Sequence, residues 1–310
     1  MENKKLKELL EREPWVYEFL AEEYKEKKEL AIAAVNAGEV FQFLPEELKA
    51  DKEVLMAAIE YGDEVFDEMD EEMFRDMDIA RTMVRVFPDD YERLPEDMQK
   101  DRQVALECVK VRGEVYEFFC RELQEDEEIM EEAIRHGLDL GEIAAPDWGK
   151  EHPDGREKLL QREELVRIAV EYHDGNQMCH ASGKLWANQE LVEFVLAKGF
   201  CQLKYLPEHL RSDKELIKRI VANIPAENYG DYIFQLHFIG EELRKDTEFL
   251  LELIAEKAEV FRFILRCKKD EVLTRYFPFE ADVPFCKKAY QVNPKTLIYM
   301  NKQMKQAVKM

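Results

Sequence analysis

The sequence contains few of the residues that build turns. Its 310 residues include only 12 glycines and 11 prolines, whereas an all-β fold needs a turn roughly every ten residues. Collagen-like and low-complexity sequences need far more of both residues. Hydrophobic residues make up 46% of the chain and aromatic residues 11%, which is enough apolar surface for a folded core. The composition therefore favours a folded, helical protein.

Cysteine is also sparse. Six cysteines are spread along the chain without a C-x-x-C pair. A disulfide-stapled domain would be denser in cysteine, and a zinc module would cluster its ligands. We therefore expect reduced and mostly buried thiols: Cys108, Cys120, Cys179, Cys201, Cys267 and Cys286.

Long apolar segments are missing. No window approaches 18 consecutive apolar residues, the length that indicates a membrane-spanning helix. Residues 1–7 lead into a charged, amphipathic stretch without the apolar core of a signal peptide. The expectation is a cytoplasmic protein that does not bind a membrane.

Basic residues are outnumbered, and the imbalance is concentrated in one region. The chain has 45 Lys and Arg against 68 Asp and Glu, a net charge of −23. Residues 1–137 hold 40 acids and 19 bases, a net charge of −21, while residues 282–310 hold six lysines and one acid. This sign disfavours direct binding to nucleic acid or to an anionic membrane. The acidic region is either an ordinary solvated surface or a surface for a basic protein partner.

A repeat is the most informative feature of the sequence. Aspartates recur at positions 51, 76, 101 and 126, a constant spacing of 25, within a shared pattern of apolar and charged residues. Each unit has room for only two short helices, which cannot bury their aromatic residues alone, whereas stacked neighbours can. The sequence therefore predicts an all-α fold, an α-solenoid of short helix-turn-helix repeats with a period of about 25 residues.

The unit around Asp51 illustrates the physical basis of the repeat. The Asp51 carboxylate is expected to cap a helix by accepting hydrogen bonds from the free amides of its first turn. Behind it, Val54, Ala58 and Tyr61 recur at helical spacing and form one buried face. Gly62 is expected to end this helix in the left-handed conformation. Pro45 is expected to end the short apolar helix at 39–44 and to open one further turn.

The segment 44–59 resembles a known repeat family. Its order of Leu-Pro-Glu-Glu-Leu-Lys-Ala-Asp-Lys-Glu followed by an Ala-Ile helix is similar to the family called domain of unknown function 4116. Copies extend over 16–137, and the pattern returns at 206–217 and from Glu241 onward. The resemblance implies a helical fold. It supplies no activity and no functional residues.

Breaks in the period and shifts in charge divide the chain into four regions. Residues 1–137 form an N-terminal acidic helical-repeat array, and residues 138–190 form an irregular insertion with one degenerate repeat. Residues 191–281 form C-terminal helical repeats, and residues 282–310 form a basic C-terminal helical cap. Insertions into repeat arrays commonly carry the binding face.

The insertion contains the side chains that are most capable of binding a metal or of catalysis. His152, His173, Asp174, Cys179 and His180 could in principle hold zinc or provide a thiolate and its base. Their spacing matches no established motif, and we interpret them as structural residues around a tight turn. We therefore expect no catalytic residue, metal or cofactor.

Partner binding is a second possible role for the same insertion. Two tryptophans accompany the histidines there, and interface energy concentrates on Trp, Tyr and Arg. The candidate partner-binding residues are Trp148, Trp186, His173 and His180.

Three functions follow from these observations. The leading hypothesis is a non-enzymatic scaffold that binds another protein. The first alternative is an acidic inhibitor or immunity-type protein, or a nucleic-acid mimic, that blocks a basic partner. The second alternative is an effector-like enzyme with a site in 138–188. Dependence on salt separates the first two, because only a partner held by charge dissociates steeply as salt rises.

Overall fold

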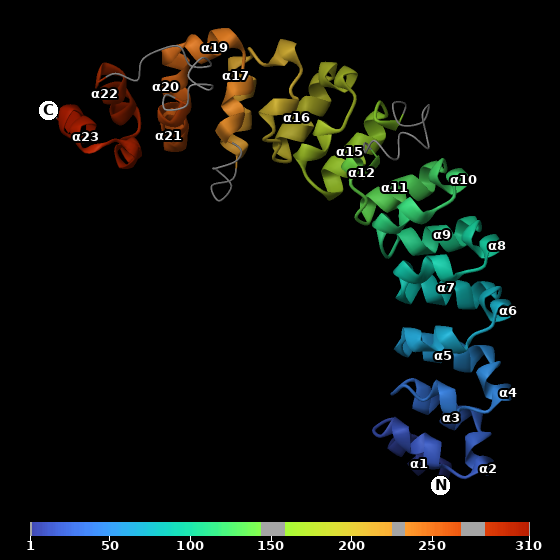
Figure 1. The fold of residues 1–310 in the computed structure, drawn as a ribbon. Coiled ribbons are helices and arrows are strands. Elements are labelled where there is room, and N and C mark those ends of the chain that lie inside the picture. Colours follow the sequence, from blue (N-terminus) through green and yellow to red (C-terminus); the bar gives the residue numbers. More distant parts are fainter. Residues whose placement is uncertain (1, 144–158, 225–232, 268–282, 310) are drawn as a thin grey trace. The chain divides into compact units, whose positions relative to one another are not determined.

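The computed structural model describes residues 2–143, 159–224, 233–267 and 283–309. Every regular element within these residues is helical and none is a strand, which confirms the all-α prediction (Figure 1). The chain forms two compact units, Met1–Leu138 and Asp139–Met310, called unit 1 and unit 2 below. Among the described residues no helix is long and apolar enough to cross a membrane.

Unit 1 alternates longer helices with pairs of short ones. Consecutive longer helices pack against each other, so that α3 contacts α5, α5 contacts α7 and α7 contacts α9 (Figure 1). The longer helices are α1 (Glu2–Leu10), α3 (Lys28–Val35), α5 (Lys52–Tyr61), α7 (Met77–Val86), α9 (Arg102–Val109) and α11 (Glu127–Arg135). The 3₁₀ helices are η1 (Pro14–Phe19), η2 (Phe41–Phe43), η3 (Asp63–Glu68), η4 (Pro88–Arg93) and η5 (Gly113–Phe118). The short α-helices are α2 (Glu22–Lys25), α4 (Glu46–Lys49), α6 (Glu71–Phe74), α8 (Glu96–Gln99) and α10 (Arg121–Gln124).

Aspartate caps start four of the longer helices, α5, α7, α9 and α11, as the repeat predicts. The Asp51 carboxylate accepts hydrogen bonds from the backbone amides of Glu53, at 3.0 Å, and Val54, at 3.3 Å. The same pair of bonds forms at the next three helices, where the acceptors are Asp76, Asp101 and Asp126. The caps satisfy amides that have no partner within the helix, so the 25-residue spacing of aspartates marks where each helix begins.

Buried tyrosines hold the short helices of three repeats in place. The Tyr17 hydroxyl donates to the carbonyl of Lys25 at 2.6 Å, and the Tyr116 hydroxyl donates to the carbonyl of Gln124 at 2.5 Å. Tyr91 makes the equivalent bond eight residues ahead, to Gln99. Burial raises the pKa of all three phenols well above the usual value. Each tyrosine therefore fills the core and also satisfies a backbone carbonyl.

The predicted role of Gly62 is wrong. Its φ of −167° is an extended conformation, and Gly62 is the single residue that joins α5 to η3. The left-handed glycine of unit 1 is Gly137, with a φ of 124°. There the amide of Leu138 donates back to the carbonyl of Ala133 at 2.9 Å, which ends α11.

Unit 2 uses the same kinds of element. Its described α-helices are α12 (Leu140–Ile143), α15 (Glu163–Tyr172), α16 (Gln189–Ala197), α17 (Lys214–Asn223), α19 (Glu241–Lys245), α20 (Thr247–Glu256), α21 (Ala258–Cys267), α22 (Val283–Val292) and α23 (Lys302–Lys309). Its described 3₁₀ helices are η6 (Gly175–Cys179), η7 (Gly183–Ala187), η8 (Leu203–Tyr205), η9 (Glu208–Leu210), η10 (Ile233–Phe238) and η12 (Pro294–Tyr299). Asp246 caps α20 with the same pair of bonds as the aspartates of unit 1, and Asp213 caps α17 with one bond, from the Leu216 amide. The described part of 138–190 is thus built from helices joined by short turns.

One close approach between chain segments occurs in both units. In unit 1 a Cβ atom on Gly113 would lie 2.0 Å from the carbonyl oxygen of Ala133. In unit 2 a Cβ atom on Gly175 would lie 2.4 Å from the carbonyl oxygen of Val195. Each glycine amide also donates a hydrogen bond of 2.9 Å to the residue before a left-handed glycine. Only glycine fits at these two positions.

Candidate functional site

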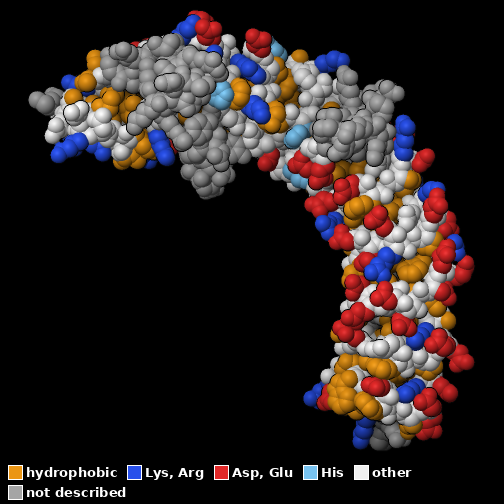
Figure 2. Space-filling model, viewed as in Figure 1, with side chains coloured by type: hydrophobic (Ala, Val, Ile, Leu, Met, Phe, Trp, Pro, Cys, Tyr) orange, Lys and Arg blue, Asp and Glu red, His pale blue; other side chains and the backbone are white. Residues whose placement is uncertain are grey.

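Acidic side chains dominate the exposed surface of unit 1. They are spread over its visible face in Figure 2, among hydrophobic and fewer basic side chains, in keeping with the net charge of −21 over residues 1–137. Some of these charges are paired within the unit and others are not. The unpaired ones identify where a partner would gain most from binding, because paired carboxylates are already neutralised.

Ion pairs tie the N-terminal ends of the longer helices together. The first residue of α3, α5 and α9 reaches the capping aspartate of the next longer helix: Lys28 contacts Asp51 at 2.8 Å, and Lys52 contacts Asp76 at 2.8 Å. Arg102 donates to Asp126 through two nitrogens, at 2.7 and 3.1 Å. These cations lower the pKa of the three capping carboxyls. We call this series the cap ladder.

One rung of the cap ladder is missing. Met77 occupies the position at which the neighbouring helices carry Lys52 and Arg102. The Asp101 carboxylate still caps α9, with bonds of 2.8 and 3.1 Å. It takes part in no ion pair with another described residue. The missing ion pair lies between α7 and α9. It separates the linked helices α5 and α7 from the linked helices α9 and α11.

A second series of carboxylates lies at the opposite ends of the same helices. Glu39, Glu64, Asp89 and Glu114 follow one another at a spacing of 25 residues, just after the C-terminal ends of α3, α5, α7 and α9. We call these four residues the acidic row. Arg112 neutralises its last two members: the guanidinium contacts Asp89 and donates to Glu114 at 2.9 and 3.0 Å.

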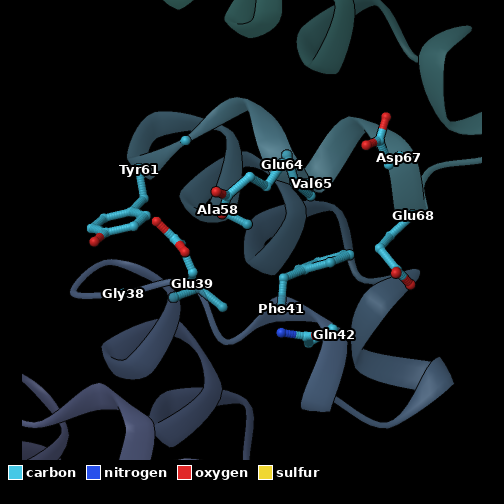
Figure 3. A pocket seen from close by; sticks show the side chains of 12 residues that line it. Gly38, Glu39, Phe41, Gln42, Ala58, Tyr61, Glu64, Val65, Asp67 and Glu68 are labelled. Carbon is cyan, nitrogen blue, oxygen red and sulfur yellow. The ribbon is translucent and has the colours of Figure 1, made fainter.

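The first two members of the acidic row border a cleft. Glu39 and Glu64 point toward one another beside the ring of Tyr61 (Figure 3). The cavity there has a volume of about 340 Å³, and Phe41 and Val65 contribute to its apolar lining. We call it the Tyr61 cleft.

The electrostatics of the cleft are unfavourable to its own carboxylates. Partial removal from water, followed by the nearby Glu39 carboxylate, raises the pKa of Glu64. No lysine or arginine lines the cavity. At its far end, Glu68 is already paired with Lys49, at 3.0 Å. The Glu39 and Glu64 pair is therefore the least compensated part of the row.

The sequence analysis did not identify the acidic row. Its signal was present, because the four carboxylates share the 25-residue spacing of the capping aspartates. That spacing was used only to locate helix starts. Spacing alone also cannot separate Glu39 and Glu64 from Asp89 and Glu114, since the position of Arg112 decides which carboxylates are neutralised.

The candidate partner-binding residues of 138–190 have different environments. Trp148 lies outside the described residues. Trp186 is only 5% exposed and packs edge-on against Phe200, with ring centroids 5.2 Å apart, so it belongs to the core rather than to an exposed anchor. His173 is exposed at the end of α15. His180 is partly buried, with its Nε2 atom 3.9 Å from an Asp139 carboxylate oxygen.

Cys179 lies in a packed turn and has the properties of a structural residue. Burial raises the pKa of the Cys179 thiol to about 12, so the thiol is protonated at neutral pH and is a poor nucleophile. Gln177 ties this turn to α12, donating to Asp139 at 2.6 Å and accepting from the Leu140 amide at 3.0 Å. His152 lies outside the described residues. Within the described ranges no group of three or more His, Cys, Asp or Glu side chains is placed to hold a metal ion.

The five cysteines whose side chains the structure describes agree with the expectation of reduced thiols. All five are thiols and not disulfides, and three of them are buried: Cys108, Cys201 and Cys286. Burial raises the pKa of Cys108 to about 12 and also raises that of Cys201. These thiols therefore behave as small apolar core residues.

Comparison with known protein families identifies the repeat. Residues 27–74 and residues 76–124 each match the model of a family described as Domain of unknown function (DUF4116). Two adjacent segments of unit 1 are therefore similar to this domain, which confirms the predicted resemblance. Comparison with curated proteins gave no match. Comparison with solved structures also gave none.

Proposed function

We propose that the chain is a non-enzymatic helical-repeat protein, an α-solenoid of units of about 25 residues, that binds another protein. Successive helices of unit 1 start 24 or 25 residues apart from α3 to α11 and pack against their neighbours. Such stacks present extended surfaces suited to binding proteins. The high pKa of Cys179 argues against a thiolate enzyme in 138–188.

The partner is a protein with a basic surface. The observation that carries this proposal is the uncompensated charge of unit 1. Unit 2 uses the same aspartate caps and the same glycine close approach with 28 acids and 26 bases, a net charge of −2. The helical architecture therefore does not require a net charge of −21. Excess charge of one sign attracts partners of the opposite sign and increases their association rate.

Salt dependence tests this binding mode. Proteins captured from the native host on the full chain should include a basic partner whose dissociation constant rises at least tenfold between 50 and 200 mM salt. Steep screening is expected because the charges lie near the surface, where the Debye length is about 10 Å at 0.1 M salt. A tightly bound partner whose affinity does not change with salt concentration would indicate binding in an apolar groove and would refute charge-driven binding.

A second candidate, an inhibitor that imitates nucleic acid, is favoured by the regular spacing of the acidic row. It predicts that duplex DNA competes with the chain for the captured partner. A partner that binds the chain and DNA at the same time would exclude the mimic and leave the scaffold.

The solenoid itself is tested by small-angle scattering. A globular domain of this length would have a radius of gyration of about 19 Å. An open stack of repeats should give a clearly larger value, whereas a value at or below about 19 Å would refute the solenoid.

A further inference from the structure

The acidic row provides an internal comparison between two of its repeat boundaries. At the boundary between Asp89 and Glu114, Arg112 bridges the two carboxylates. Arg112 stands two residues before Glu114. At the boundary between Glu39 and Glu64, the residue two positions before Glu64 is Gly62. The Asp89–Glu114 boundary thus contains its own cation, whereas the Glu39–Glu64 boundary has the equivalent carboxylates without one.

The backbone at the second boundary has the same extended conformation. Gly62 has φ −167° and ψ 163°, and Arg112 has φ −146° and ψ 107°. A Cβ atom built on Gly62 would meet no atom within 4 Å. Neither strain nor crowding requires glycine here, so the absence of a side chain leaves the space between the carboxylates accessible from outside.

Tyr61 adds a feature that the first boundary lacks. Its ring is 45% exposed and lies beside Glu39 and Glu64 (Figure 3). The residue at the corresponding place before Arg112 is Val111. An aromatic face attracts a cation placed over it, and arginine most of all, because the planar guanidinium stacks on the ring. Two carboxylates and an aromatic ring around a cavity match the chemistry of a single guanidinium group.

We propose that the Tyr61 cleft is the binding site for one arginine side chain of a basic protein partner. This inference rests on the proposed function and specifies where on unit 1 the partner binds. The arginine occupies the place that Arg112 fills at the later boundary: its guanidinium bridges Glu39 and Glu64 and lies against Tyr61. Lysine would bind more weakly, since an ammonium cannot make the planar, two-pronged contact.

The side chain alone is the probe for the first experiment. N-acetyl-arginine amide is titrated into the ¹⁵N-labelled full chain, and amide shifts are followed by NMR. We expect saturable shifts at Gly38, Tyr61, Gly62 and Glu64, with a dissociation constant on the order of millimolar. N-acetyl-citrulline amide, which has nearly the same shape without the charge, is the matched control and should produce no saturable shift.

Variants then test the site itself. Glu39→Gln combined with Glu64→Gln should weaken arginine binding at least fivefold. Gly62→Arg should abolish it, because the new guanidinium occupies the cleft as Arg112 does at its own boundary. The matched control is Glu92→Gln combined with Glu117→Gln, which removes the same charge from exposed positions of unit 1. This control should bind as the parent does, and circular dichroism verifies that every variant is folded.

Two outcomes would overturn the inference. One is a set of shifts spread over the acidic surface with equal affinity and equally reduced by both double variants. The other is binding of citrulline as tight as that of arginine. If a captured basic partner binds the Glu39→Gln and Glu64→Gln variant as it binds the parent, the cleft proposal fails while the proposed function stands. If no basic partner binds the parent, the proposed function fails, whatever the cleft does.

Discussion

The two units share their local architecture and differ in their charge. In both, a left-handed glycine ends a helix, a second glycine lies against that end, and aspartates cap helices. Unit 1 carries 40 acids and 19 bases, whereas unit 2 carries 28 and 26. Backbone geometry and surface charge are therefore set independently. The backbone geometry follows from glycine and aspartate at fixed positions, and the surface charge differs between the units while these positions stay the same.

Replacing the close-approach glycines should have the largest effect on stability. Gly113→Ala and Gly175→Ala each place a methyl group within 2.4 Å of backbone atoms of a neighbouring segment. We expect a loss of about 3 kcal/mol in the affected unit, because backbone has to move to relieve the overlap. Urea denaturation, followed by hydrogen exchange to assign the unit, measures the loss.

Gly62→Ala is the matched control for both variants. Its extended φ and open surroundings accept a methyl group, so stability should stay level or rise by about 0.4–1 kcal/mol. Equal losses at Gly113 and Gly175 would support one shared motif. A negligible loss at either position would show that the two units are built differently there.

Removing charge from the capping aspartates should have a smaller effect. Asn caps a helix nearly as well as Asp, so Asp→Asn isolates the ion pair. We expect about 0.5–1 kcal/mol for Asp126→Asn, which loses two bonds from Arg102, and less for Asp246→Asn, which loses one from Lys214 at 2.6 Å. Asp101→Asn should have almost no effect. Thermal or urea unfolding ranks the stabilities of the three variants. A large loss of stability in Asp101→Asn would contradict the conclusion that Asp101 has no ion pair.

Acid should remove the stabilisation that the Arg102–Asp126 ion pair provides. Arg102 lowers the pKa of Asp126, so the Asp126 carboxylate binds a proton more weakly in the folded state than in the unfolded state. The stabilisation is complete above the usual aspartate pKa of about 4 and disappears as pH falls through the lower folded value. The stability difference between the parent and Asp126→Asn should therefore be constant from pH 7 to 5 and shrink below pH 4. A difference unchanged at pH 2 would show that the charge is not its source.

Filling the gap in the cap ladder should have the smallest effect, and it is stabilising. Met77→Lys places an ammonium beside Asp101, as Lys52 lies beside Asp76. An exposed ion pair contributes about 0.2–1 kcal/mol, and Met77→Gln controls for the lost apolar side chain. A gain that persists in 1 M salt would not be electrostatic.

Local signals in the sequence predicted most of the fold. The capping aspartates and the turn after Pro45 depend on residues within one repeat. The predicted buried face of α5 is correct for Val54 and Ala58 but wrong for Tyr61, which is 45% exposed. Features that depend on contacts between repeats were not predictable. The sequence suggested a left-handed Gly62, but the residue is extended between α5 and η3. Trp186 was a candidate partner-binding residue, but it is buried against Phe200.

Less of the candidate site could be predicted. Net charge pointed to unit 1, yet with so many acids no pair stood out. Identifying Glu39 and Glu64 required knowing that their side chains converge and that Arg112 neutralises Asp89 and Glu114 instead. Periodicity locates a row of carboxylates, but only three-dimensional contacts show which of them lack a cation.

The cap ladder and the acidic row also have a mechanical consequence. They lie at opposite ends of helices such as α5, which is about 15 Å long. Attraction links neighbouring helices at the ladder end, while Glu39 and Glu64 repel each other at the other end. We expect the Glu39–Glu64 boundary to flex as a hinge, stiff where the cations bridge and compliant where they are absent. A bound cation would stiffen the compliant end, so occupancy of one small cleft would be transmitted along the helices as a change in elasticity.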